Sequence, residues 1–212
     1  MKIGVLALQG DFALHAKALA ACGARSASRG ASGGEASPTI EAVEVRKPEQ
    51  LADLDGLIMP GGESTTLLKL MDEWGFVPAL EKFHGAGKPI FGTCAGLILL
   101  ARDVDNPRQF SLGLIDVGVE RNAYGRQRES FETPGQVTLD GPPTSLEMVF
   151  IRAPRIRRVG PGVQTLARHG DEPVMARQGS VLVATFHPEL TDDPAVHRYF
   201  CEMVREAAGK AA

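Results

Sequence analysis

Two patterns of hydrophobic residues alternate along the first half of this chain. Short apolar runs bounded by glycine or polar residues are typical of strands covered on both faces, and they occupy residues 3–8, 43–45, 57–59 and 89–92. Between these runs, apolar residues recur every three or four positions, which predicts amphipathic helices over residues 12–22, 64–74, 77–84 and from 95 onward. This strand–helix repetition predicts a parallel sheet wrapped by helices on both faces.

Capping residues set the expected ends of the helices. Asp11 is expected to cap the first helix and Gly23 to end it. Ser64 is expected to cap the second helix, and Pro194 to start the last one.

The second half of the chain has a different pattern. Short strand-like stretches separated by turns occupy residues 114–119, 136–139, 148–151, 174–176 and 181–186. Their close spacing predicts hairpins and an antiparallel extension of the parallel sheet. The expected fold is therefore an α/β fold with an open, mostly parallel sheet, helices on both faces and an antiparallel extension. A chain of 212 residues with 43% hydrophobic content suits one domain over 1–212.

One segment interrupts this pattern. Residues 24–39 contain no Val, Ile, Leu or aromatic residue. Such a stretch buries too little apolar surface to offset its ordering entropy, so we expect a mobile surface loop there.

Charge and composition exclude several classes of protein. A net charge of −3 and an isoelectric point near 6.0 leave no basic surface for nucleic acid or an anionic membrane. No apolar run approaches the ~20 residues that span a bilayer, and the start is unlike a signal peptide. Three widely spaced cysteines form no disulfide framework. We expect a cytoplasmic protein that needs no cofactor and no metal.

Cys94 carries the strongest chemical signal. It lies between an apolar run and a helical pattern, within Gly92-Thr93-Cys94-Ala95-Gly96. Small neighbours allow the sharp strand-to-helix turn that exposes a nucleophile, and the start of a helix favours the reactive thiolate. The alternative is a small buried hydrophobe, the usual role of a free cysteine. We keep that interpretation for Cys22 and Cys201.

A cysteine nucleophile needs a base, and His187 is the best candidate among five histidines. It ends the apolar run 181–186 and precedes Pro188-Glu189. Strands of an open α/β sheet present ligand sites at their carboxyl ends, so His187 and Cys94 are expected to face one crevice. In an extended segment His187 and Glu189 project to the same side, which lets the carboxylate orient the imidazole. The alternative is a solvated strand end.

The other four histidines are expected to lie outside this site. Three fall on helical patterns and are predicted at the surface or its boundary, and the fourth reads as part of a turn: His15, His84, His197 and His169, respectively.

A glycine pair supplies a possible oxyanion site. Gly61-Gly62 follows an apolar run and opens a helix, so its backbone N–H groups are left uncovered. The amides of Gly62 and Ala95 are the expected oxyanion donors. Gly-Gly is also a common turn.

Taken together, these motifs resemble those of the triad glutamine amidotransferases, and within them the glutaminase subunits of pyridoxal 5′-phosphate synthase. The matching stretches are residues 4–10, 60–66, 91–97, 120–122 with 125–127, 150–154 and 186–190. The resemblance implies a flavodoxin-like, class I glutamine amidotransferase fold that hydrolyses L-glutamine to glutamate and ammonia. It implies a hetero-oligomer with a synthase subunit that takes up the ammonia and activates the glutaminase.

The resemblance also implies residue roles. The catalytic residues are Cys94, His187 and Glu189, and the oxyanion donors are Gly62 and Ala95. The substrate-binding residues are Gly62, Glu63, Ser64, Arg121, Ile151 and Arg152. An arginine can hold the α-carboxylate of glutamine with two hydrogen bonds. The alternatives are a structural ion pair for Arg152 and a surface position for Arg121.

Three other functions remain open on the sequence. One alternative is a glutaminase that serves another synthase, such as one for imidazole glycerol phosphate or guanylate. A second is a γ-glutamyl peptidase. A third alternative is a non-catalytic scaffold subunit of a synthase complex.

Overall fold

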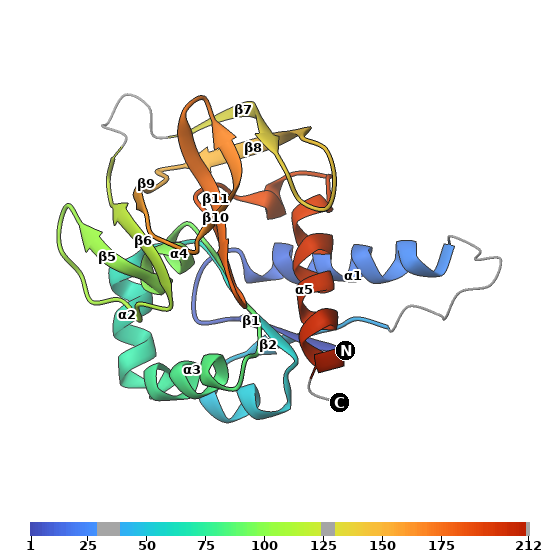
Figure 1. The fold of residues 1–212 in the computed structure, drawn as a ribbon. Helices are drawn as coiled ribbons and strands as arrows, with labels where there is room; N and C mark the ends of the chain where they lie inside the picture. The colour runs from blue at the N-terminus through green and yellow to red at the C-terminus, as the bar shows by residue number, and fades with distance from the viewer. Residues whose placement is uncertain (29–38, 124–129, 211–212) are drawn as a thin grey trace.

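A computed structural model describes residues 1–28, 39–123 and 130–210 (Figure 1). Its helices are α1 (Phe12–Ser28), α2 (Ser64–Glu73), α3 (Phe76–Gly85), α4 (Ala95–Leu100) and α5 (Ala195–Lys210), with short 3-10 helices η1 (Pro48–Asp53) and η2 (Pro188–Leu190). Its strands are β1 (Lys2–Leu6), β2 (Glu41–Val45), β3 (Gly56–Met59), β4 (Ile90–Thr93), β5 (Ala101–Asp105), β6 (Ile115–Glu120), β7 (Ser130–Val137), β8 (Thr144–Ile151), β9 (Arg155–Val159), β10 (Gln164–His169), β11 (Glu172–Gln178) and β12 (Val181–Ala184). None of the helices described is long and apolar enough to cross a membrane.

Across the described residues, nine strands form one mixed sheet in the order β2-β1-β3-β4-β12-β11-β10-β7-β8. The first five strands pair in parallel, and every pair from β12 onward is antiparallel. The predicted α/β fold with an antiparallel extension is confirmed. Within the sheet, β4 and β12 are parallel neighbours with Thr93 opposite Ala184. The segments that follow these two strands therefore begin side by side.

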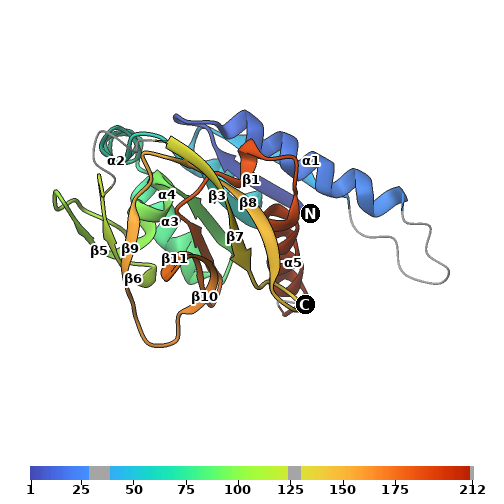
Figure 2. The same ribbon diagram turned by 90° about the horizontal axis from the view of Figure 1, so that it is seen from above.

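The two faces of the sheet bury separate hydrophobic clusters. Leu57 and Met59 of β3 belong to a cluster with residues of α2, α3 and α4. Ile58, between them, belongs to the opposite cluster with residues of α1 and α5. Because successive side chains of a strand point to opposite faces, a continuous apolar run is buried on both sides. The two groups of helices lie on opposite sides of the sheet (Figure 2).

A second sheet of three strands, β5-β6-β9, was not predicted as a separate sheet. Both β5 and β9, like β10 of the large sheet, lie outside every stretch expected to be a strand. Half or more of the residues in β5 and β9 are charged, as in Arg155–Val159. These charges pair across the sheet: Arg158 donates to Asp103 and Asp116 at 2.6 and 2.7 Å. The spacing of apolar residues alone does not reveal strands that are stabilised by pairs of charged side chains.

Two helix ends differ from the prediction. The first helix continues through Gly23 to Ser28, because one glycine costs a helix only about 1 kcal/mol and the flanking alanines favour it. The first five residues of the predicted 24–39 loop are therefore helical, and residues 29–38 lie outside the described residues. The cap of α2 is Glu63 and not Ser64, because the Glu63 carboxylate accepts from the amides of Thr65 and Thr66.

Candidate active site

Cys94 occupies the sharp turn between β4 and α4. Its backbone adopts φ 47° and ψ −100°, a conformation that costs a non-glycine residue about 1–3 kcal/mol. The Cys94 amide donates to the carbonyl of Ala184 at 2.9 Å, which ties the turn to the end of β12. The cysteine thus lies on a strained strand-to-helix turn, as its small neighbours predicted.

Close backbone approach explains the glycines on either side of Cys94. A Cβ on Gly96 would lie 2.1 Å from the carbonyl oxygen of Met59, and a Cβ on Gly92 would lie 2.6 Å from the carbonyl carbon of Gly96. Backbone atoms cannot yield as a flexible side chain does, so both positions require glycine.

His187 follows β12 and pairs with Glu189. The Nδ1 atom of His187 lies 2.7 Å from Oε1 of Glu189, and both residues are buried. The pairing is as expected, but the extended conformation is wrong: residues 188–190 form the short helix η2. Proline favours the first turn of a helix, so Pro188 starts a turn here. The amide of His187 also donates to the carbonyl of Val149 at 2.8 Å.

Cys94 and His187 lie close enough to interact electrostatically. Burial by itself would lower the pKa of His187, but hydrogen bonds and charge interactions with Cys94 and Glu189 outweigh it and raise the pKa to about 10. His187 is therefore protonated at neutral pH.

Gly61 lies against both of these side chains. A Cβ there would be 2.4 Å from Cε1 of His187 and 3.2 Å from Cβ of Cys94. The strand-to-helix turn after β3 thus forms one wall of the site, and any larger side chain at Gly61 would displace the imidazole.

The next residues of this turn are held by hydrogen bonds. The Glu63 carboxylate accepts from the Thr65 and Thr66 amides at 3.1 and 2.6 Å. Desolvation raises the pKa of Glu63, but these bonds and one from the Thr66 hydroxyl outweigh it and lower the pKa to about 2. The buried hydroxyl of Ser64 donates to Oε1 of Gln109 at 3.1 Å. Both predicted binding residues thus shape the turn beside Gly62.

Arg121 reaches the same turn from the end of β6. Its guanidinium donates to the Thr65 hydroxyl at 2.9 Å and lies 3.7 Å from the Glu63 carboxylate. The side chain is 11% exposed, which rules out the free surface position considered for it. Residues 125–127, which belong to the same matching stretch, lie outside the described residues.

Ile151 and Arg152 approach the site from the end of β8. The carbonyl oxygen of Ile151 lies 4.0 Å from Sγ of Cys94. Arg152 is exposed, has a positive φ of 43°, and makes no salt bridge with the part of the chain that the structure describes. The alternative considered for Arg152 was a structural ion pair, and no described residue forms one with it.

The predicted oxyanion donors lie at the starts of two turns that meet at the site. Gly62 precedes the cap of α2, and Ala95 is the first residue of α4. No backbone carbonyl in the described ranges accepts from either amide. Both N–H groups are thus free of the main-chain bonds that would occupy them.

Two histidines were wrongly predicted at the surface. His15 and His197 are both fully buried, and Nε2 of His15 lies 3.3 Å from Oε2 of Glu189. The periodicity contains the missing signal. His15 precedes Leu19 by four residues, and His197 precedes Cys201 by four, so each falls on the apolar face of its helix. His169 ends β10 and does not lie in a turn.

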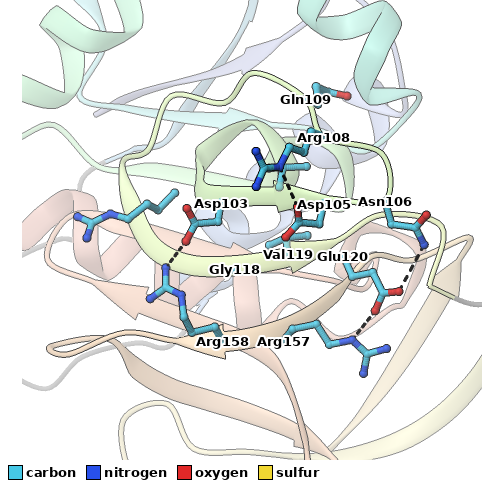
Figure 3. A pocket seen from close by; sticks show the side chains of 12 residues that line it. Asp103, Asp105, Asn106, Arg108, Gln109, Gly118, Val119, Glu120, Arg157 and Arg158 are labelled. Atoms are coloured by element: carbon cyan, nitrogen blue, oxygen red, sulfur yellow. Dashed lines mark hydrogen bonds and ion pairs between the residues drawn. The ribbon is translucent and has the colours of Figure 1, made fainter.

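A separate cavity of about 700 Å³ lies over β5, β6 and β9 (Figure 3). Its acidic side chains each face an arginine, in the pairs Asp103–Arg158, Asp105–Arg108 and Glu120–Arg157. Cys94, His187 and Glu189 do not line it. The cavity is therefore not the site of the cysteine chemistry.

Comparison with known proteins supports one family along almost the whole chain. The sequence model of the SNO glutamine amidotransferase family matches residues 5–206. The chain is 51% identical over 207 residues to pyridoxal 5′-phosphate synthase subunit PdxT of Geobacillus kaustophilus, covering 98% of this chain and 96% of that protein. It is 52% identical over 205 residues to the subunit of the same name in Koribacter versatilis, covering 97% and 96% of the two chains.

The fold has a similar counterpart among solved structures. A structure described as a crystal structure of glutamine amidotransferase superposes with a TM-score of 0.82. It is 49% identical in sequence, and the match covers 96% of this chain and 98% of that one.

Proposed function

The chain belongs to the SNO glutamine amidotransferase family, and on that premise we propose that it hydrolyses glutamine through Cys94, His187 and Glu189. The ammonia passes to a subunit of pyridoxal 5′-phosphate synthase, the assembly named in the curated relatives. One observation carries the proposal: His187 lies beside Cys94 at the Gly61 turn, and its Nδ1 is held by a buried carboxylate. A cysteine nucleophile with an oriented base requires this arrangement.

The first step is attack on the side-chain amide of glutamine. The Cys94 thiolate forms a C–S bond to the amide carbon, and the carbonyl electron pair moves to oxygen. The amides of Gly62 and Ala95 stabilise this oxyanion. Nε2 of His187 then gives its proton to the amide nitrogen, the C–N bond breaks, and ammonia leaves.

The second step hydrolyses the γ-glutamyl thioester. His187, now neutral, takes a proton from water, and the resulting hydroxide attacks the thioester carbon. The C–S bond breaks, glutamate leaves, and the Cys94 thiolate is restored beside a protonated His187. Glu189 holds the imidazole in one tautomer through Nδ1 in both steps.

The substrate's α-carboxylate is held by arginine. Arg152 has no salt bridge to the described residues, so its guanidinium is available for two hydrogen bonds to a carboxylate. Arg121 is already bonded to Thr65 and orders the turn at Gly62, Glu63 and Ser64 that lines the pocket. Ile151 closes the pocket with its backbone, close to the sulfur of Cys94.

The functional unit is a cytoplasmic hetero-oligomer with the synthase subunit. The relatives' name supplies the partner, and three cysteines that form no disulfide suit a reducing compartment. Ammonia that is consumed by a partner is best released only in its presence, so we expect the isolated chain to turn over glutamine slowly.

The proposal is tested by glutamate release with and without the synthase subunit. Cys94→Ala is expected to abolish release in the assembled complex, whereas Cys22→Ala, a matched loss of a buried thiol, is expected to retain it. Labelling by an electrophilic glutamine analogue is expected at Cys94 alone. Wild-type turnover in Cys94→Ala would overturn the proposed mechanism.

The partner is tested separately. Purified synthase subunits for pyridoxal 5′-phosphate, imidazole glycerol phosphate and guanylate are each added to the chain with glutamine. We expect only the first to raise glutamate release. Activation by one of the others would keep the glutaminase mechanism and replace the partner.

A further inference from the structure

Two histidines lie in the core beside Glu189, and the proposed mechanism does not use them. His15 of α1 and His197 of α5 are both 0% exposed. The ring of Phe91 meets both at its edge, with centroids 6.4 and 6.3 Å away. They are buried polar groups in an apolar layer, and such groups are rarely present without hydrogen-bond partners.

Their nitrogens form a chain of contacts that ends at the triad. Nδ1 of His15 lies 2.9 Å from Nε2 of His197. Nε2 of His15 lies 3.3 Å from Oε2 of Glu189 and 3.3 Å from the hydroxyl oxygen of Thr93. Oε2 of Glu189 is buried and accepts no hydrogen bond from the described residues, His15 included. Such an atom needs a donor, and Nε2 of His15, 3.3 Å away, is within reach of it.

One proton arrangement suits this chain. A neutral histidine carries one N–H. With that N–H on Nε2, His15 presents a donor to the carboxylate, and its Nδ1 accepts from Nε2 of His197. Nδ1 of His197, which has no partner among the described residues, is then a bare acceptor. The opposite arrangement faces a lone pair toward the carboxylate and buries an unpaired N–H, which is rarer.

The charge of the two histidines fits this role. Burial, followed by the charges of His197 and His187, lowers the pKa of His15 well below its ordinary value. Burial lowers the pKa of His197 to about 4. Both are neutral at physiological pH, so His15 can donate a hydrogen bond without cancelling the negative charge that His187 needs. A lysine or arginine in its place would compete with His187 for the carboxylate.

We infer that His15 is a positioning residue of the glutaminase reaction: it donates from Nε2 to the second oxygen of Glu189 and holds that carboxylate against His187. His197 fixes the tautomer of His15 from the other side. This inference rests on the triad proposed above. The inference adds a buried row of contacts that runs from His197 of α5 through His15 of α1 to Glu189 and His187.

Steady-state glutamate release by the complex with the synthase subunit tests the role of His15. His15→Leu removes the donor with little change in volume. We expect kcat to fall by about 10- to 100-fold, the effect of losing one hydrogen bond to a charged group. KM is expected to stay within about threefold, because His15 does not touch the substrate. The acid limb of the kcat profile is expected to move to higher pH, because a carboxylate without its donor binds a proton more readily.

Two further variants separate positioning from folding. His15→Gln keeps an N–H near the position of Nε2 and is expected to recover most of kcat and the acid limb. Leu19→Ala loosens the same face of α1 one turn away and removes no polar group, so it is expected to lose thermal stability while keeping kcat and the pH profile. A folded His15→Leu with wild-type kcat and acid limb would overturn the inference. So would a Leu19→Ala with the same changes as His15→Leu.

The tautomer is measured without any substitution. Nitrogen shifts of ¹⁵N-histidine-labelled protein are expected to show His15 as a neutral ring protonated on Nε2, and His187 as an imidazolium. A His15 imidazolium, or protonation on Nδ1, would overturn the inference. Cys94→Ala assayed in parallel reports on the triad itself, so failure of the proposed function is distinguished from failure of the role of His15.

Discussion

The two sides of Glu189 hold histidines in opposite protonation states. On one oxygen, His187 has its pKa raised to about 10. Beyond the other oxygen, His197 has its pKa lowered to about 4, and that of His15 is also lowered. All three side chains are buried. Burial therefore does not decide the state of these histidines.

The difference comes from the groups that each ring contacts. His187 interacts with Cys94 and with the Glu189 carboxylate, and these interactions compensate its desolvation. His197 contacts the ring of His15 and has only desolvation to lower its pKa. One carboxylate can neutralise one buried cation, and His187 is that cation. The proton is thus held on the side of the carboxylate that faces Cys94, which is where the proposed mechanism uses it.

Glu189→Gln is expected to have the largest effect on this asymmetry. The amide is isosteric but carries no charge, so the pKa of His187 falls toward those of the other two rings. We expect kcat for glutamate release to drop by about 10³- to 10⁴-fold, as in triads that lose the charge of the orienting acid. Measurement is by steady-state kinetics in the assembled complex.

An exposed glutamate provides the control for this change. Glu81→Gln removes a charge from an exposed position of α3, a helix that contributes no residue to the site, and is expected to leave kcat unchanged. If Glu189→Gln turned over glutamine at the wild-type rate, Glu189 would have no place in the triad.

Gly61→Ala is expected to disturb His187 and to leave His15 and His197, on the other side of Glu189, unchanged. The new methyl group would lie 2.4 Å from Cε1 of His187 and 3.2 Å from Cβ of Cys94, so the ring must leave its position beside Cys94 and Glu189. A displacement of this size is expected to lower kcat about 100-fold. Gly85→Ala, where nothing lies within 4 Å of the added methyl, is the matched control and is expected to match wild type. A fully active Gly61→Ala would show that the imidazole is not confined there.

The same asymmetry predicts opposite slopes of stability with pH. For His187 the folded pKa exceeds the unfolded value, so its contribution is complete below pH 6.5 and is lost as pH rises toward about 10. For His197 the folded pKa is the lower one, so stability is lost as pH falls from 6.5 toward about 4. Thermal unfolding from pH 4 to 10 measures both slopes.

Variants assign each slope to its ring. His187→Gln is expected to flatten the alkaline slope only, and His197→Phe to reduce the acid slope, to which His15 also contributes. The comparison between variant and wild type cancels the carboxylates that also titrate below pH 6. An alkaline slope that survives in His187→Gln would contradict the raised pKa.

Part of this site was predictable from local sequence. The glycines beside Cys94 predict the elbow because only a close backbone approach explains them, and the structure shows that approach at Met59. The pairing of His187 with Glu189 was predicted from their spacing, although the extended conformation assumed for it was wrong. The parallel strands followed from unbroken apolar runs, which have no other explanation than burial on both faces.

Other parts depend on contacts between distant segments. His15 and His197 are 182 residues apart, and only the packing of α1 against α5 brings their nitrogens to 2.9 Å. The charged strands β5 and β9 pair through arginine and aspartate, which an apolar pattern does not report. Polar residues on an apolar helix face were the missed signal. A histidine in such a position is better interpreted as a buried group that needs a hydrogen-bond partner than as a surface residue.

The smallest expected effect on rate belongs to His197→Phe. The substitution keeps a ring in the core and removes the N–H that His197 donates to Nδ1 of His15. The carboxylate of Glu189 still favours a proton on Nε2 of His15, so that tautomer is weakened but not lost. We expect kcat to fall only about two- to fivefold, less than one full hydrogen bond to a charged group. A loss of kcat as large as that of His15→Leu would mean that the two histidines act as one unit. His197 would then be as important as His15 for the position of Glu189.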